Sequence, residues 1–313
     1  MEPGQNSLVV IGNFDGVHLG HRAVIEAALS EARDAGLRPL ALTFEPHPSE
    51  VLGGGVRPVL TVLDRKIDLI ERLGPELKVV VEPFTLELSR FTPAQFAQEF
   101  LIELLSAKVV IVGDNFRFGH RRSGDLPALV SLGRELGFAA HASSLVGDAS
   151  GPYSSTRARA ALAAGDLGAV GAVLGRPHSL SGTVVQGAQR GRTIGVPTAN
   201  LGGVTEALPP YGVYAVLVDC VREGGSTAIA IGVANIGLRP TVAAGFSVEV
   251  HLLDFSQDLY GESLRVHLVS RLRDEQKFAG LPELQAQIAR DIEHARQALA
   301  FAVPDPLAAG AWY

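Results

Sequence analysis

The sequence is poor in cysteine, with Cys220 as its single copy. One cysteine can form neither a disulfide within the chain nor a cysteine-rich metal site, so a disulfide-stabilised secreted fold is excluded and a cytoplasmic location is expected. No uninterrupted apolar run reaches about 18 residues, and no charged-then-apolar leader opens the chain. We therefore expect neither a membrane span nor a membrane partner.

A surplus of positive charge is also missing. The 27 basic and 33 acidic side chains leave a net charge of −6, and the chain contains no basic block. A large footprint on duplex nucleic acid is therefore not expected, and any bound nucleotide should be small. Charged residues make up only 19% of the chain against 47% hydrophobic residues, which is enough apolar surface for a folded core.

Glycine is abundant, with 35 copies grouped in loops that follow strand-like runs. The length of 313 residues is about twice a usual domain of roughly 150, which predicts two domains. Short β-branched runs alternate with helical spacing between residues 7 and 142, which predicts a parallel sheet with ligands at the carboxyl ends of its strands. The expected strands are 8–11, 39–44, 79–81 and 109–112, each buried on both faces, and the expected helices are 22–35, 64–73 and 93–105.

The second half of the chain has a different pattern. Two alanine-rich helical segments between residues 155 and 174 end at Gly175-Arg176-Pro177. Strand-type runs at 182–185, 213–218, 228–233, 246–252 and 264–269 follow without a long helix between them, which predicts a small antiparallel barrel. A helix from 281 to about 300 closes the pattern. The predicted fold is α/β plus all-β, with a Rossmann-like domain over 1–178 and a barrel domain with a terminal helix over 179–313.

Residues 12–21 connect the first predicted strand to a helix. A strand–turn–helix of this kind directs backbone N–H groups at an anion, and Gly20 leaves room for a phosphate. His18 and His21 are three residues apart, so both imidazoles can face one phosphate in its transition state. A capped helix with incidental histidines is one alternative. A zinc pair is a poorer one, because the His-Glu-x-x-His pattern and further cysteine ligands are missing.

Three further segments carry side chains that suit substrate binding. The stiff Pro46–Pro48 segment could form a wall over a flat ring or an ordinary turn. Residues 114–119 begin where a buried strand ends, which places Asn115 and Arg117 at the mouth of a cleft, and one of the two phenylalanines beside them should be core. The hydroxyls at 155 and 156 could simply cap a helix, but the arginines at 157 and 159 also suit a leaving pyrophosphate.

These four segments together resemble the H-x-G-H nucleotidyltransferases, and in particular the FAD synthetase modules of prokaryotes. The resemblance implies transfer of AMP from ATP onto FMN with release of pyrophosphate, with His18 and His21 as catalytic residues. Ala158 stands where family members commonly have isoleucine, which leaves the polar groups intact. The resemblance implies phosphate contacts at Gly12, Phe14, Asp15, Gly20, Ser155, Thr156 and Arg159, and flavin contacts at Pro46, His47, Asn115 and Arg117.

The second glycine-rich segment spans residues 187–201. Its glycines keep a loop thin enough to wrap a polyphosphate, while Thr198 and Asn200 offer neutral oxygens of the kind that hold Mg²⁺. It is not a P-loop, because the Gly-Lys-Ser/Thr ending is absent. A glycine-rich hairpin turn is the alternative interpretation.

With residues 237–241, 248–255, 259–261 and 271–278, this segment resembles the riboflavin kinase domain. There the Pro-Thr-Ala-Asn element binds ATP and magnesium, and a glutamate matching Glu249 is the catalytic base. Strand alternation places Glu249 opposite Val248 and Val250, so a solvated exterior position is the alternative, and Asp254 is the next candidate base. The resemblance implies ATP contacts at Gly187, Gly191, Arg192, Gly195, Pro197, Thr198 and Asn200, magnesium at Thr198 and Asn200, and flavin contacts at Arg271 and Glu275.

The predicted function is bifunctional: ATP-dependent phosphorylation of riboflavin to FMN in the barrel, then adenylylation of FMN to FAD in the first domain. The expected partners are small molecules, namely riboflavin, FMN and ATP with Mg²⁺. A single-activity adenylyltransferase with a ligand-sensing barrel and a flavin-binding regulator without turnover are the two alternatives. The oligomeric state is not predicted. The resemblance covers about residues 8–300, and residues 301–313 are expected to be a flexible end.

Overall fold

The computed structural model describes residues 5–55, 57–187, 191, 194–223, 225–238 and 245–300. The chain divides into two compact units, Met1–Ser155 and Thr156–Tyr313, which are described separately. This division lies before the two helices between residues 155 and 174 and so places them in the second unit. The predicted boundary at 178/179 instead places both helices in the adenylyltransferase domain. That functional boundary stays a prediction.

The first unit contains a five-stranded parallel sheet in the order β3-β2-β1-β4-β5. A small hairpin of β6 (Gly147–Asp148) and β7 (Gly151–Pro152) follows it. The strands of the sheet are β1 (Ser7–Ile11), β2 (Arg38–Glu45), β3 (Lys78–Pro83), β4 (Ala107–Gly113) and β5 (Ala139–Ser143). Four of these were predicted as strands, and β5 was not.

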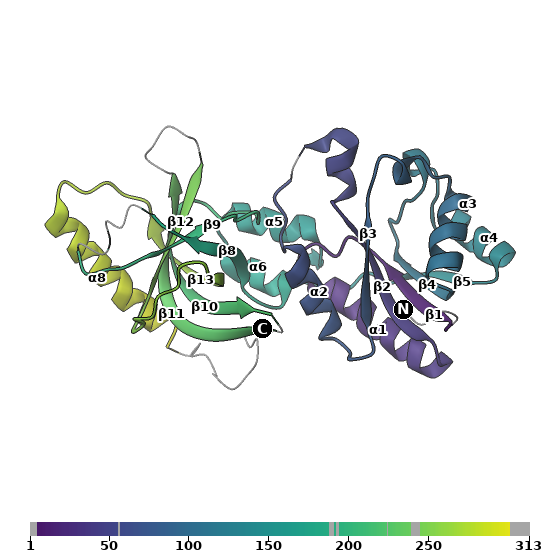
Figure 1. Cartoon of the computed structure of the whole chain (residues 1–313), viewed down its shortest axis with the longest axis horizontal. Coiled ribbons are helices and arrows are strands. Elements are labelled where there is room, and N and C mark those ends of the chain that lie inside the picture. Colours follow the sequence, from purple (N-terminus) through teal and green to yellow (C-terminus); the bar gives the residue numbers. More distant parts are fainter. Residues whose placement is uncertain are drawn as a thin grey trace. The chain divides into compact units, whose positions relative to one another are not determined.

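Helices cover both faces of this sheet (Figure 1). The predicted helix 93–105 begins as expected, because the Thr92 side chain accepts from the Gln95 N–H in a capping box, but it continues as a π-helix after one α-helical turn. The long helices are α1 (Leu19–Ala35), α2 (Leu63–Glu71), the π-helix η3 (Ala97–Leu104) and α4 (Leu126–Leu136). The short ones are η1 (Glu50–Gly54), η2 (Leu88–Arg90), α3 (Pro93–Phe96) and η4 (His120–Arg122).

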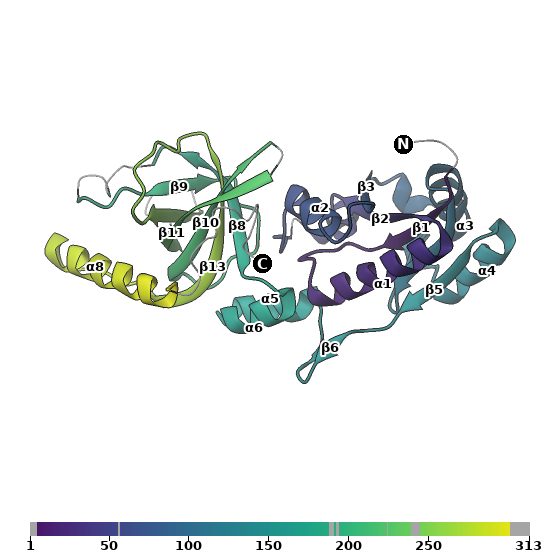
Figure 2. The ribbon, with the colours of Figure 1, turned by 90° about the horizontal axis from the view of Figure 1, so that it is seen from below.

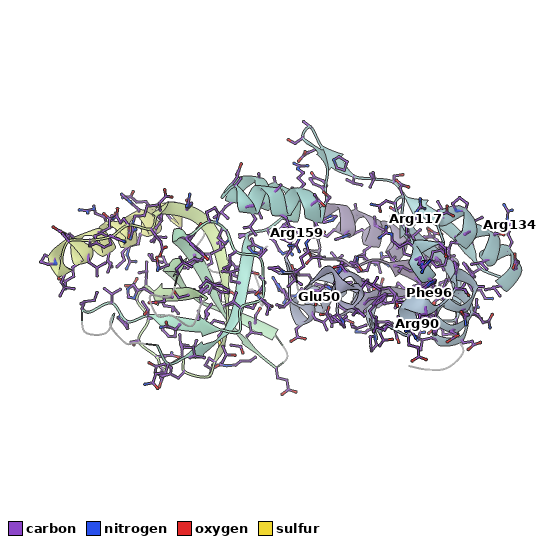
Figure 3. All side chains as sticks on the ribbon, turned by 90° about the horizontal axis from the view of Figure 1, so that it is seen from above. Glu50, Arg90, Phe96, Arg117, Arg134 and Arg159 are labelled. Atoms are coloured by element: carbon purple, nitrogen blue, oxygen red, sulfur yellow. The ribbon has the colours of Figure 1, made fainter. Side chains whose placement is uncertain are left out.

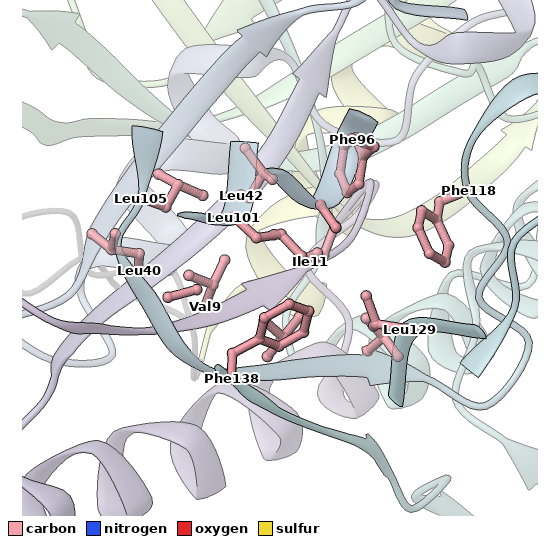
Figure 4. Packing of buried hydrophobic residues seen from close by; sticks show 14 of the residues in the cluster. Val9, Ile11, Leu40, Leu42, Phe96, Leu101, Leu105, Phe118, Leu129 and Phe138 are labelled. Atoms are coloured by element: carbon pink, nitrogen blue, oxygen red, sulfur yellow. The ribbon is translucent and has the colours of Figure 1, made fainter. Parts of the chain in front are cut away.

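Alternate residues of β1 enter two separate cores. Leu8 and Val10 pack with the buried residues of α1 and α2, whereas Val9 and Ile11 pack with the side chains of η3 and α4 (Figure 4). The prediction of a strand buried on both faces is therefore confirmed for β1. It is wrong for residues 79–81, which are only partly buried because β3 lies at the edge of the sheet and has a neighbouring strand on one side alone.

Strand β1 lies between β2 and β4 in the sheet. The chain passes from β1 through α1 to β2 on one side, and returns later to β4 on the other. In sheets of this kind the crevice for a ligand lies beyond the carboxyl ends of the strands at this point. The loop before α1 and the loop after β4 both begin there.

The second unit begins with α5 (Ser155–Ala163), whose first residue closes the first unit, and α6 (Leu167–Leu174). Asp166 caps α6, and Gly175 ends it with φ of 73°, as the break in the sequence pattern predicts. Six strands then close a barrel in the order β10-β11-β12-β9-β8-β13. They are β8 (His178–Val185), β9 (Ala199–Gly202), β10 (Gly212–Arg222), β11 (Gly225–Leu238), β12 (Phe246–Leu252) and β13 (Ser263–Asp274).

The antiparallel barrel is confirmed, and its final helix is α8 (Leu281–Ala298), which lies against the barrel wall (Figure 2). Ala295 of α8 packs on Ala215 and Leu217 of β10. The Arg273 guanidinium of β13 donates to both carboxylate oxygens of Asp291 at 2.8–3.0 Å, which fixes the helix to the strand. Strand β9 was not predicted. In the described part of the chain, no helix has the length and apolar character needed to cross a membrane.

Candidate active sites

His18 and His21 lie together at the start of α1. Their rings stack with centroids 3.6 Å apart and planes 20° from parallel. His18 is also the N-cap of the helix, and its Nδ1 accepts from the His21 N–H at 3.3 Å. Nδ1 of His18 therefore caps the helix, and the predicted phosphate contacts of the two histidines stay a prediction.

The turn before these histidines is tight. Val17 has φ of 38°, which is rare for a β-branched residue, and Phe14 has φ of 49°. The Phe14 ring is buried and packs edge-on against the His21 ring, with the two ring centroids 5.3 Å apart. A Cβ on Gly20 would lie 3.1 Å from the His18 ring and 3.2 Å from the Tyr153 carbonyl oxygen, so the turn has no room for a side chain there.

Asp15 connects this turn to two other segments of the first unit. Its Oδ1 accepts from the Leu60 N–H at 2.8 Å, and its carbonyl oxygen accepts from the Ser155 hydroxyl at 2.8 Å. The Ser155 hydroxyl therefore joins two of the motifs that the sequence singled out. Thr156 and Arg159 follow on α5 (Figure 3).

The segment after β2 contains His47, whose ring contacts Ser49. Its Nδ1 accepts from the Ser49 N–H at 3.2 Å and lies 2.8 Å from the Ser49 hydroxyl. Burial lowers the pKa of His47, and the Coulomb attraction of Asp15 opposes that shift. Burial and the Ser49 N–H contact both favour the neutral ring, in which Nδ1 accepts a hydrogen bond. The preceding Glu45–Pro46 peptide bond is cis.

Sequence reasoning missed Lys66 of α2, which is buried although it is charged. Its Nζ lies 3.8 Å from Glu45 Oε2. Burial lowers the pKa of Lys66, while Glu45 and Asp15 act to raise it. Helical periodicity alone gives no signal for a buried lysine, because lysine is ordinarily a surface residue.

The loop after β4 carries Asn115 and Arg117, and both side chains are exposed. Arg117 Nη1 lies 3.6 Å from Asp125 Oδ2 (Figure 3). Phe118 is the core aromatic, and Phe116 stacks on it with centroids 5.4 Å apart and planes 17° from parallel. The expectation that one of the two aromatics is core is confirmed.

In the barrel, the glycine-rich segment packs against the predicted magnesium ligands. A Cβ on Gly187 would lie 2.6 Å from Asn200 Cγ, and one on Gly191 would lie 3.5 Å from Thr198 Oγ1. The Gly191 carbonyl oxygen also accepts from the Val196 N–H at 2.9 Å, which closes the loop on itself. Hydroxyl and amide oxygens are suitable ligands for Mg²⁺, so the donor set fits the predicted metal. Arg192 lies outside the described residues.

Glu249 lies in the middle of β12, directly opposite Asn200 of β9 and Asn235 of β11. Val248 and Val250 are buried, so Glu249 faces the outer side of the barrel, where it is half-buried. His251, on the same face, donates from Nδ1 to the Pro197 carbonyl oxygen at 2.7 Å and so holds the Thr198 segment beside β12. Asn235 and His251 were both missed by sequence reasoning, because their proximity depends on strand register.

The two predicted flavin contacts of the barrel, Arg271 and Glu275, have different surroundings. The Glu275 carboxylate lies over Gly237 of β11, where a Cβ would be 2.6 Å from Glu275 Cδ. Arg271 Nη2 donates to the Tyr211 carbonyl oxygen at 2.9 Å and forms an ion pair with Asp274 Oδ1 at 2.8 Å. Its guanidinium is therefore engaged in contacts within the barrel unit. Part of the predicted 237–241 motif, residues 239–241, lies outside the described residues.

Asp254, the alternative base, is held by Arg296 of α8. Two hydrogen bonds of 2.8 and 2.9 Å join the guanidinium to its carboxylate. This contact lowers the pKa of Asp254 and directs both oxygens toward the helix. Glu249 makes no such ion pair within the described residues.

The fold and these two residue sets are those of a two-part transferase, with a nucleotidyltransferase-type α/β unit followed by a barrel that carries a glycine-rich segment and a carboxylate. The family model for FAD synthetase matches residues 2–157, and the one for riboflavin kinase matches residues 174–299. The chain belongs to the family of bifunctional riboflavin kinases/FMN adenylyltransferases. This confirms the predicted bifunctional enzyme, with its adenylyltransferase part first and its kinase part second.

Relatives match along nearly the whole chain. The bifunctional riboflavin kinase/FMN adenylyltransferase of Escherichia coli K12 is 41% identical over 297 residues, covering 94% of this chain and 93% of that relative. The protein of the same name from Bacillus subtilis is 37% identical over 302 residues, with 94% and 93% covered. A solved Streptococcus pneumoniae structure, described as a macrolide-efflux protein, is 30% identical with a TM-score of 0.81 over 95% of both chains.

Proposed function

We propose that the crevice beyond β1 and β4 is where FMN is adenylylated. The phosphate of FMN is already an anion, so the reaction needs no base and depends on stabilising charge at the α-phosphate of ATP. His18 and His21 supply hydrogen bonds to that phosphate, supported by their stacked placement at the N-terminus of α1. We assign the remaining ATP contacts to Gly12, Phe14, Asp15, Gly20, Ser155, Thr156 and Arg159, and the flavin contacts to Pro46, His47, Asn115 and Arg117.

The outer face of β9 and β12 carries the proposed kinase site. The ribityl hydroxyl of riboflavin must lose a proton as it attacks the γ-phosphate, and Glu249 is the acceptor for that proton. Thr198 and Asn200 hold Mg²⁺, which neutralises phosphate charge when it is bound with ATP. We assign further ATP contacts to Gly187, Gly191, Arg192, Gly195 and Pro197, and flavin contacts to Arg271 and Glu275.

The functional boundary that we propose is 178/179, so that α5 and α6 serve the adenylyltransferase part. Its support is the family match to residues 2–157, which already extends into α5. The substrates are small molecules, and the negative net charge supports the absence of a nucleic-acid partner. The single, buried cysteine supports a cytoplasmic location.

The observation that carries the kinase assignment is the direct pairing of Glu249 with Asn200 across β12 and β9. Glu249→Gln keeps the size of the side chain and removes the proton acceptor, so FMN formation should fall by about 10²- to 10⁴-fold. FAD formation from supplied FMN should stay at the wild-type rate. A folded Glu249→Gln protein with the wild-type kinase rate would remove Glu249 from the mechanism.

The histidine pair is tested in the other reaction. His21→Ala should lower the kcat of FMN adenylylation by about 10²-fold, the scale of losing a transition-state hydrogen bond, while FMN binding changes much less. His141→Ala, which removes an exposed histidine paired with Glu31, is the matched control and should keep the wild-type rate. A loss of FMN affinity at unchanged kcat would make His21 a binding residue only.

A further inference from the structure

The outer face of β11 changes from apolar to polar along its length. Ile231 and Val233 pack with α8, but Asn235, the next residue on that face, carries an amide. The Asn235 side chain is half-buried and makes no hydrogen bond to any residue that the structure describes. The amide is half-exposed, so water can complete its hydrogen bonds, and a ligand can take the place of that water.

Asn235 belongs to a row of polar side chains that crosses three strands. The antiparallel register places Asn200 opposite Glu249, and Glu249 opposite Asn235, so all three side chains lie on one face. Directly opposed Cβ atoms in such pairs are about 4.5–5.5 Å apart. Glu249 therefore has an amide within reach on each side.

The two ends of this row are not equivalent. Asn200 lies against Gly187 and two residues from Thr198, which marks the end of the row where ATP and Mg²⁺ are proposed to bind. In phosphoryl transfer the attacking oxygen approaches in line with the leaving group, from its opposite side. With the attacked hydroxyl at Glu249, the rest of the acceptor extends away from the ATP loop, toward Asn235.

Another polar group lies beside the Asn235 end of this row, farther along β11. Gly237 lies two residues beyond Asn235 on the same face of β11, and the Glu275 carboxylate occupies the space that a side chain at 237 would fill. The proposed polyphosphate loop, the base and the amide therefore follow one another across the strands, and the Glu275 carboxylate lies next to the amide along β11. This order fits an acceptor with a polar chain next to its attacked hydroxyl.

We propose that Asn235 is a specificity-determining residue of the kinase site and binds the inner hydroxyl groups of the ribityl chain of riboflavin. A hydroxyl group both donates and accepts hydrogen bonds, and a carboxamide offers a donor and an acceptor to match it. The inference rests on the proposed kinase site, because Glu249 and Asn200 define the direction of the acceptor.

Two substrates test the proposal. Riboflavin is compared with a flavin whose N10 chain is 5-hydroxypentyl, which keeps the attacked hydroxyl and lacks the three inner ones. The wild-type chain should prefer riboflavin in kcat/KM, and Asn235→Leu should reduce that preference at least about tenfold by slowing riboflavin far more than the analogue. Asn235→Ser, which keeps one hydroxyl, should retain part of the preference. Thr227→Ala, at an exposed position of β11, is the control and should retain all of it.

The outcomes separate this inference from the site on which it rests. An equal loss for both flavins in a folded Asn235→Leu protein, or an unchanged preference, would overturn the role of Asn235. If Asn235→Leu does not fold, the test rests on Asn235→Ser. An Asn235→Ser protein with a normal rate and the full wild-type preference for riboflavin over the 5-hydroxypentyl flavin would overturn the proposal in the same way. Glu249→Gln is measured with both flavins in parallel, and normal phosphorylation by that variant would instead overturn the kinase site itself.

Discussion

Gly187→Ala is a perturbation whose effect can be worked out from distances in the barrel. The added methyl would lie 2.6 Å from Asn200 Cγ and 2.7 Å from Oδ1, whereas ordinary contact begins at 3.4 Å. The amide nitrogen Nδ2 lies closer still, so the Asn200 amide must move by about 1 Å or change its rotamer. The Gly187 backbone is outside the left-handed region, so alanine brings no conformational penalty of its own.

A displacement close to 1 Å at a group that positions a reacting phosphate can cost about 10²-fold in rate. We expect Gly187→Ala to lower the kcat of FMN formation by that order, measured by chromatography of the flavins, and to change the free energy of unfolding by less than about 1 kcal/mol. FAD formation from supplied FMN should be unchanged. Gly280→Ala is the matched control, because the nearest atom to its new methyl would be 3.6 Å away.

A double-mutant cycle identifies Asn200 as the route of the effect. If the methyl acts by displacing the Asn200 amide, Gly187→Ala combined with Asn200→Ala should be no slower than Asn200→Ala alone. Two results would refute the reasoning. One is a rate loss in the double variant equal to the product of the losses in the two single variants, and the other is a normal kinase rate in a folded Gly187→Ala protein.

Three other predictions follow from single contacts. Asp291→Ala should destabilise the barrel by about 1.5–3 kcal/mol in urea unfolding, because it removes the charged hydrogen bonds of Arg273, whose side chain is 20% exposed. A change below about 0.5 kcal/mol would show that α8 docks without this pair. Asp254→Asn should keep the kinase rate within about threefold, since the carboxylate serves Arg296, and a loss of 10²-fold would make Asp254 the base instead. Because the pKa of His47 is lowered in the folded chain, the unfolded chain binds a proton first as the pH falls below 6.5, and the free energy of unfolding decreases on acidification. His47→Gln should therefore flatten the pH dependence of the free energy of unfolding between pH 7 and 5. An unchanged slope would contradict this prediction.

Local patterns were sufficient for most of the fold. The continuous apolar run of β1 reflects two cores, one on each face of the strand, and Thr92 and Gly36 mark the ends of helices through contacts within a few residues. These signals are local in the chain, so the sequence alone displays them. The burial of β3 was predicted wrongly, because position within a sheet depends on strand order and not on the composition of the strand.

The components that sequence reasoning missed depend on contacts between distant segments. The proximity of Asn235 to Glu249 requires the register of β11 with β12, and β9 is a four-residue strand whose pairing cannot be inferred from its own residues. The burial of Lys66 likewise follows from the packing of α2 near Glu45. Register and packing are non-local, so neither periodicity nor a motif reveals them.

The central claim is that one chain carries two separate reactions, one dependent on His21 and the other on Glu249. The most direct measurement follows the flavins formed from riboflavin and Mg·ATP by each single variant and by the two variants mixed. His21→Ala should accumulate FMN without FAD, Glu249→Gln should leave riboflavin unchanged, and the mixture should form FAD because each variant supplies the step that the other lacks. FAD formation by His21→Ala alone, or by Glu249→Gln alone, at the wild-type rate would contradict the account.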